Sequence, residues 1–159
     1  MGNYKTSRSS CNFQKIILIT LEEAYYGTTR IVHNKGIPDF LVKIPPGVKA
    51  GWRIRVRKKD NQNVDGQIGD LYLAIEIMPH AIYERKGDDL YCNVYIDMLM
   101  AMTGGNIRVD TFAGPIVIKV PQGISSGSTI RVRGRGMPKF NKPGEYGHLY
   151  LRVVVTNLT

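Results

Sequence analysis

The residues whose types most clearly suggest a chemical role in this chain are basic, and they lie in two short clusters. Residues 49–59 and 131–142 together hold 11 of the 22 lysines and arginines. In residues 53–57, arginine alternates with apolar residues, so on a β-strand the guanidinium groups would form a stripe on one side. Such a stripe could neutralise phosphates, which makes nucleic-acid binding a possible function. The basic residues of the two clusters are Lys49, Arg53, Arg55, Arg57, Lys58, Lys59, Arg131, Arg133, Arg135, Lys139 and Lys142.

The lack of aromatic residues among these arginines weakens the case for nucleic-acid binding. No aromatic side chain is interleaved with the arginines of either stripe, whereas single strands bind by stacking their bases on aromatic rings. A solvated outer sheet face is the commoner explanation for arginines that alternate along a strand. Nucleic-acid binding therefore stands as the alternative function, and we do not expect nucleic acid as the main partner.

Catalysis and metal binding have little support in the sequence. No serine lies in a Gly-x-Ser-x-Gly turn, and the three histidines, His33, His80 and His148, lack a spacing that suggests a metal site. Two cysteines, Cys11 and Cys92, cannot form a zinc cluster or a disulfide framework. We therefore expect a protein that is not an enzyme and that uses no metal and no cofactor.

The length and composition leave room for one or two small folded domains. The 159 residues are 43% hydrophobic and 22% charged, with a net charge of +9, which is typical of a folded soluble protein. No apolar run approaches the roughly 18 residues that a membrane span needs. The first dozen residues are polar and do not resemble a signal peptide. We expect a cytoplasmic protein that does not contact membranes.

An internal repeat organises the chain. The segment LVKIPPGVKAGWRIRVR at 41–57 matches VIKVPQGISSGSTIRVR at 117–133, with eight of seventeen positions identical. Further along, GDLYL at 69–73 matches GHLYL at 147–151. Because the matches are collinear, the chain is predicted to contain two copies of one supersecondary unit. We expect a disordered leader over residues 1–12, a first β-domain over 13–80 and a second β-domain over 81–159.

Each copy is predicted to be built from short strands and one short helix. Thr20 and Glu23 have the spacing of a capping box, and Gly27 can end the helix in a left-handed conformation, so a helix is expected at 21–26. Asp97 and Gly104 bracket the equivalent helix. The fold class is all-β, with two tandem, homologous, β-sandwich-like domains that have one short helix each. Strands of the first copy are expected at 13–20, 28–33, 40–44, 53–57 and 71–77.

These segments together resemble the C-terminal substrate-binding region of the DnaJ family of J-domain co-chaperones. The resemblance covers roughly residues 17–155 and is specific through a combination of motifs. It implies two tandem β-domains with a hydrophobic peptide groove on the first. The motifs, in chain order, are LEEAYYGTT, IPPGVKAG, GDLYL, PHAIYERKGDDLY and VPQGISSGSTIRVRGRG.

The resemblance also implies which residues bind partners. The groove for non-native polypeptides would lie between the strands at 28–33 and 40–44 and be closed by the connection between the copies. An ordinary core role for its residues stays open from the sequence alone. The implied groove residues are Val32, Phe40, Val42 and Tyr83. A possible second groove in the second copy would consist of Ile107, Val109, Ile116 and Ile118.

Arg30 lies beside the implied groove. In the family, a basic residue here binds the acidic C-terminal tail of the seventy-kilodalton heat-shock chaperone. A guanidinium suits this task because its planar fork can bind a carboxylate through two hydrogen bonds. The alternative is a solvated surface arginine.

The sequence departs from a complete co-chaperone in ways that bear on its partners. It has no His-Pro-Asp tripeptide and hence no J-domain, and it has no Cys-x-x-Cys pairs between Gly27 and Phe40, so it resembles the zinc-free subclass. Relatives dimerise through a segment after the last strand, and this chain stops at Thr159. We expect a fragment whose full-length protein is a homodimer, and the oligomeric state of the fragment stays open.

Overall fold

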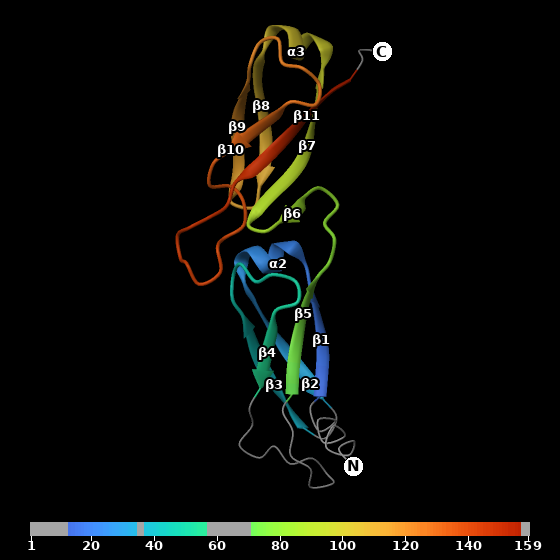
Figure 1. The fold of residues 1–159 in the computed structure, drawn as a ribbon, viewed down its shortest axis with the longest axis vertical. Helices are drawn as coiled ribbons and strands as arrows, with labels where there is room; N and C mark the ends of the chain where they lie inside the picture. Colours follow the sequence, from blue (N-terminus) through green and yellow to red (C-terminus); the bar gives the residue numbers. More distant parts are fainter. Residues whose placement is uncertain (1–12, 35–36, 57–70, 157–159) are drawn as a thin grey trace, which may run out of the picture. The chain divides into compact units, whose positions relative to one another are not determined.

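The chain divides into two compact units in a computed structural model that describes residues 13–34, 37–56 and 71–156 (Figure 1). The first unit is Met1–Met78 and the second is Pro79–Thr159. The predicted leader and residues 57–59 of the first basic cluster lie outside the described residues. Within the described ranges, neither helix has the length or apolar character needed to cross a membrane.

The first unit contains a three-stranded sheet, a separate hairpin and one short helix. Its elements are β1 (Phe13–Ile19), α2 (Leu21–Tyr26), β2 (Thr28–Asn34), β3 (Ile37–Ile44), β4 (Arg53–Val56) and β5 (Leu71–Ile77). The sheet has the order β1-β5-β4, in which β1 runs parallel to β5 and β4 runs antiparallel to it. The hairpin consists of β2 and β3, and α2 lies at one end of these strands (Figure 1).

Helix α2 begins and ends where the sequence predicts. The Thr20 hydroxyl accepts a hydrogen bond from the Glu23 amide at 3.1 Å, and the Glu23 carboxylate accepts one from the Thr20 amide at 2.9 Å. This reciprocal pair satisfies two donors at the helix start that would otherwise lack partners. Gly27 follows the helix with φ 81° and lies against Pro46, where a side chain would be both strained and crowded.

The core of the first unit is built from alternating residues of its strands. Because side chains alternate between the two faces of a strand, β1 and β3 bury every second residue, whereas β5 buries Ala74 between Leu73 and Ile75 as well. Strand β3 begins three residues before the predicted start and includes Pro38; a proline is tolerated there because β3 pairs only with β2 among the described strands. The buried apolar residues include Ile17, Ile19, Leu21, Ala24, Val32, Val42, Ile44, Val48, Leu71, Leu73 and Ile75.

The second unit repeats this plan and adds one strand. Its elements are β6 (Glu84–Lys86), β7 (Asp89–Asp97), α3 (Met98–Thr103), β8 (Gly105–Thr111), β9 (Gly114–Val120), β10 (Thr129–Val132) and β11 (Leu149–Thr156). The sheet has the order β10-β11-β7-β6, with β11 parallel to β7, and the hairpin consists of β8 and β9. The side chain of Asp97 caps α3 by accepting from the Met100 amide at 2.8 Å.

The predicted all-β class is confirmed, with one six-residue helix in each unit. The parallel pair β7 and β11 takes the place of β1 and β5, and β10 takes the place of β4. The sequence repeat therefore corresponds to a repeated order of elements and a repeated strand pairing. In both units the hairpin that follows the helix holds the candidate groove residues, except Tyr83, which lies before β6.

Candidate functional site

The β2–β3 hairpin brings three of the four predicted groove residues onto one face. Val32 is paired with Phe40 across the hairpin, and Arg30 is paired with Val42. Directly paired residues of antiparallel strands point to the same side. Since the two strands are hydrogen-bonded to each other, a groove here would have this shared face as its floor.

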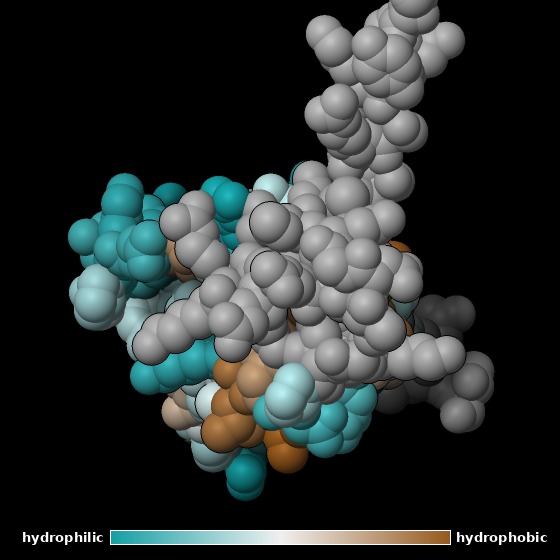
Figure 2. Space-filling model, turned by 90° about the horizontal axis from the view of Figure 1, so that it is seen from below, coloured by the Kyte–Doolittle hydropathy of each residue, from teal (hydrophilic) through white to brown (hydrophobic). Residues whose placement is uncertain are grey.

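The burial of these residues shows which of them a ligand could reach. Val32 and Val42 are only 2% and 7% exposed, whereas Phe40 is half-buried. The opposite face of the hairpin carries Ile31 and Leu41, which are paired with each other and are 59% and 71% exposed. Figure 2 shows hydrophobic side chains at the molecular surface, bordered by hydrophilic ones. The sequence analysis did not single out Ile31 and Leu41, although alternation along the strands places both side chains opposite the core.

Tyr83, the fourth predicted groove residue, belongs to the second unit. Its ring packs against Phe112 and His80, with centroid separations of 5.0 and 5.3 Å. Its hydroxyl donates a hydrogen bond to the backbone carbonyl of Asp110. Burial, reinforced by the nearby Cys92 and Asp110, raises the pKa of Tyr83 to about 12, so the hydroxyl stays protonated as a donor. A role for Tyr83 in the groove stays a prediction.

Arg30 forms an ion pair within its own unit. Its Nη2 atom lies 2.6 Å from Oε1 of Glu23, the residue that also completes the capping box of α2. Burial alone would raise the pKa of Glu23, but hydrogen bonds from the Thr20 backbone and from Arg30 outweigh it and hold the pKa below its ordinary value. Glu23 is therefore ionised at neutral pH, and any external carboxylate must compete with it for Arg30.

The hairpin of the second unit has an equivalent face without this charge pair. Ile107 is paired with Ile118, and Val109 is paired with Ile116, so all four residues of the possible second groove share one side. Val109 is buried and the other three are half-buried. Ile107, which takes the place of Arg30, packs against the core cluster of this unit together with Met100, which takes the place of Glu23.

The structure changes one argument about the basic clusters. Along the chain no aromatic residue is interleaved with the arginines, but the paired strand supplies one in each unit. Tyr72 is in register with Arg55, and Tyr150 is in register with Arg131. The guanidinium of Arg53 also lies over the Tyr72 ring, 4.7 Å from its centroid. Strand pairing therefore places aromatic rings beside the arginines although none is interleaved with them along the chain, and nucleic-acid binding stays the alternative prediction.

The described residues offer neither a cluster of metal ligands nor an activated thiol. Among the described residues, no three histidine, cysteine or acidic side chains lie close enough to hold a metal ion. Cys92 is buried in β7, and burial raises the pKa of its thiol. A thiol in that environment is a poor nucleophile, because the reactive form is the thiolate.

The model of the DnaJ C terminal domain matches residues 14–157. That range contains both hairpins, both helices and both repeat copies described above. The chain belongs to the DnaJ C-terminal domain family. The family resemblance inferred from the motifs is thereby confirmed over nearly the whole length.

Individual DnaJ relatives agree with this assignment. The chain is 35% identical over 155 residues to a protein named Chaperone protein DnaJ 2 from Thermus thermophilus, covering 98% of this chain and 53% of that protein. It is 43% identical over 115 residues to Chaperone protein DnaJ from Opitutus terrae, covering 72% of this chain and 30% of the relative. A DnaJ-like protein of Synechocystis sp. is 38% identical over 138 residues, or 87% of this chain and 41% of the relative. The chain thus spans about half or less of the length of these relatives.

Proposed function

We propose that this chain is the substrate-binding part of a DnaJ-type co-chaperone and is not an enzyme. It holds apolar segments of non-native polypeptides and delivers them to the seventy-kilodalton heat-shock chaperone. The observation that carries this proposal is the family match over residues 14–157, which includes the hairpins of both units. The names of the relatives, all chaperones or DnaJ-like proteins, support it.

The hairpin has the physical properties that binding an extended peptide requires. Among the described strands, β2 and β3 pair only with each other, so each has one edge without a neighbouring strand in this part of the chain. An added peptide strand can form backbone hydrogen bonds at such an edge, while side-chain contacts select apolar residues. Phe40 supplies a half-buried aromatic ring on one face of this hairpin.

Suppression of aggregation tests the client-holding proposal. The chain at about equimolar concentration is expected to lower the light scattering of a chemically denatured enzyme on dilution, because it covers exposed apolar segments. An unrelated basic protein of similar size serves as the control for charge. Equal scattering with the chain and with the control would contradict the proposal.

Docking of an acidic tail is the second part of the proposal. Arg30 would release Glu23 and bind a carboxylate of the partner chaperone in its place, as an exchange of one ion pair for another. Such an exchange gives modest affinity because the arginine is already paired. Modest affinity suits a contact that must form and break during client transfer.

Two substitutions measure this exchange with a fluorescent peptide that ends in Glu-Glu-Val-Asp. Arg30→Ala is expected to weaken binding about tenfold, since one charge-assisted hydrogen bond contributes roughly 1.5 kcal/mol or more. Glu23→Gln is expected to tighten binding, because glutamine can still complete the capping box but no longer competes as a carboxylate. Unchanged affinity in both variants would remove Arg30 from the docking site.

The proposal has three further parts, of which two concern the whole protein and one concerns the second hairpin of this chain. The subclass would be the one without a zinc-binding insertion, and the full-length protein would be a homodimer. The second hairpin, with Ile107, Val109, Ile116 and Ile118, would offer a further apolar surface to clients.

A further inference from the structure

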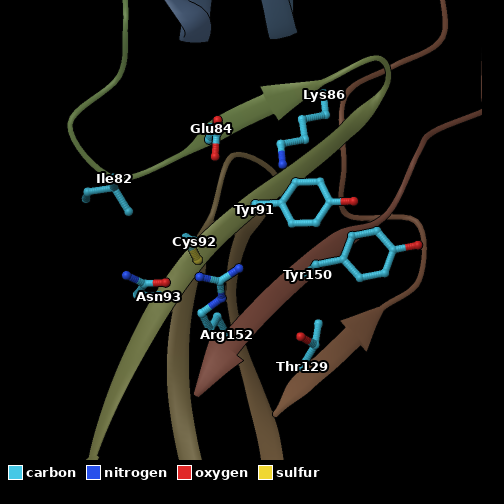
Figure 3. Close-up of a pocket in the computed structure, with 9 residues that line it drawn as sticks. All are labelled: Ile82, Glu84, Lys86, Tyr91, Cys92, Asn93, Thr129, Tyr150 and Arg152. Atoms are coloured by element: carbon cyan, nitrogen blue, oxygen red, sulfur yellow. The ribbon is translucent and has the colours of Figure 1, made fainter. Parts of the chain in front are cut away.

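The four-stranded sheet of the second unit carries a pair of stacked tyrosines on its outer face. Tyr91 of β7 and Tyr150 of β11 are in register, with ring centroids 4.9 Å apart and planes inclined by only 16° (Figure 3). The residues that follow them, Cys92 and Leu151, are buried. Since side chains alternate along a strand, the two tyrosines lie on the face directed away from the core.

Basic side chains surround this pair on the same sheet. The Nζ atom of Lys86 lies 4.9 Å from the centroid of the Tyr91 ring. Arg131 of β10 is in register with Tyr150, and Arg152 is in register with Thr129 on one side and with Asn93 on the other. Within residues 13–34, 37–56 and 71–156, neither guanidinium has an ion-pair partner.

A hollow lies beside the tyrosine pair, Lys86 and Arg152. Its volume is about 290 Å³, close to the lower limit of about 300 Å³ for pockets that enclose a small ligand. It can therefore accept one planar group. Glu84 is the one acidic residue among those that line it, so the charge around the tyrosines is positive. The lining residues, shown in Figure 3, are Ile82, Glu84, Lys86, Tyr91, Cys92, Asn93, Thr129, Tyr150 and Arg152.

The combination of stacked rings and unpaired cations narrows the ligand class. The cations favour an anion, and the tyrosines favour a flat ring that can stack on them. Asn93 and Thr129 add an amide and a hydroxyl that can form hydrogen bonds at the base edges. Single-stranded nucleic acid supplies all three partners, namely phosphates, exposed ring faces and base edges. A duplex keeps its bases stacked inside, and an acidic peptide offers carboxylates without rings.

Two features of the chain strengthen this choice. Tyr95, two residues beyond Asn93 on the same side of β7, is exposed and extends the aromatic surface along the strand. In the first unit, the three paired positions that correspond to Tyr91, Tyr150 and Arg131 hold a single tyrosine. This is Tyr72, which is in register with Gln14 on one side and with Arg55 on the other. The tyrosine pair is therefore a property of the second unit alone among the described residues.

We infer that the outer sheet face of the second unit is a binding site for single-stranded nucleic acid. A base stacks on the tyrosine pair, and Arg131, Arg152 and Lys86 contact the phosphates on either side. The site lies on a different face from the apolar surface of the β8–β9 hairpin, and it is independent of client holding. It accounts for part of the net charge of +9 that the proposed function leaves unused.

Fluorescence anisotropy of a labelled oligothymidine of about twelve nucleotides tests the site. The complete chain is expected to bind it with a micromolar Kd at about 0.15 M salt, more tightly than a duplex of the same length. Tyr150→Ala is expected to weaken binding about tenfold, because one stacking platform is lost. Arg152→Ala is expected to weaken binding and to reduce its dependence on salt.

Two control variants and one control ligand separate stacking from general charge attraction. Tyr26→Ala removes an exposed tyrosine from the first unit, and Arg108→Ala removes an exposed arginine from the second hairpin; both are expected to bind as the unaltered chain does. A polyglutamate peptide is expected to bind at least tenfold more weakly than the oligonucleotide. Absence of oligonucleotide binding, binding unaffected by Tyr150→Ala, or equal affinity for polyglutamate would each overturn the inference.

Discussion

Replacing Gly147 with alanine is expected to lower the free energy of unfolding of the second unit by about 3 kcal/mol. A methyl group at this position would overlap the backbone carbonyl of Asp88, with its carbon only 2.5 Å away. The neighbouring backbone cannot easily move aside, because it is tied down by hydrogen bonds. The Met137 amide donates to the Asp88 carbonyl at 2.8 Å, and the Gly147 amide donates to the Met137 carbonyl at 2.9 Å.

Urea denaturation followed by circular dichroism measures this effect, and Gly144 provides the matched control. Gly144 has φ 83° and open space around its Cα, so alanine there meets only the left-handed backbone strain, about 1–2 kcal/mol. A Gly147→Ala variant as stable as the unaltered chain would show that the three crossing backbone segments are not closely packed. This close packing also explains why glycine opens the repeated motif GHLYL at 147–151.

Features determined by neighbouring residues could be predicted from the sequence. The capping box of Thr20 and Glu23 depends on a spacing of three residues, and Gly27 and Gly104 end their helices directly after the last turn. The repeat was equally visible, because both copies keep the residues that form turns and strand interiors. These local signals were sufficient for the all-β class and for the position of both helices.

Features that depend on strand pairing could not be predicted in the same way. The stacking of Tyr91 on Tyr150 joins residues that are far apart in the sequence, and nothing in either segment indicates a parallel register. The ion pair of Arg30 with Glu23 was missed for a related reason, since it joins a helix to the strand that follows it.

Phe40→Ala is expected to raise about tenfold the concentration of chain needed to suppress client aggregation. Phe40 is the half-buried aromatic ring on the proposed groove face, beside the buried Val32 with which it is paired. Loss of contacts from a phenylalanine side chain removes roughly 1.5–3 kcal/mol of apolar binding, which corresponds to at least a tenfold change. Phe40→Leu should restore most of the activity, because leucine keeps an apolar side chain in the groove.

Leu41 provides a matched control for Phe40. It is the next residue on β3, and its side chain lies on the opposite face of the hairpin and is largely exposed. Leu41→Ala removes apolar surface from the same strand without changing the proposed groove face. Circular dichroism and urea denaturation of all three variants identify any loss of activity that comes from unfolding.

The most direct test of client binding at the first hairpin is the aggregation assay with Phe40→Ala and Leu41→Ala side by side. The groove assignment predicts that Phe40→Ala loses most of the suppression at a concentration where Leu41→Ala, equally folded, keeps it. The opposite result, in which Leu41→Ala loses suppression and folded Phe40→Ala keeps it, would place the client on the exposed pair Ile31 and Leu41. Equal, full suppression by both variants would remove the first hairpin from client binding.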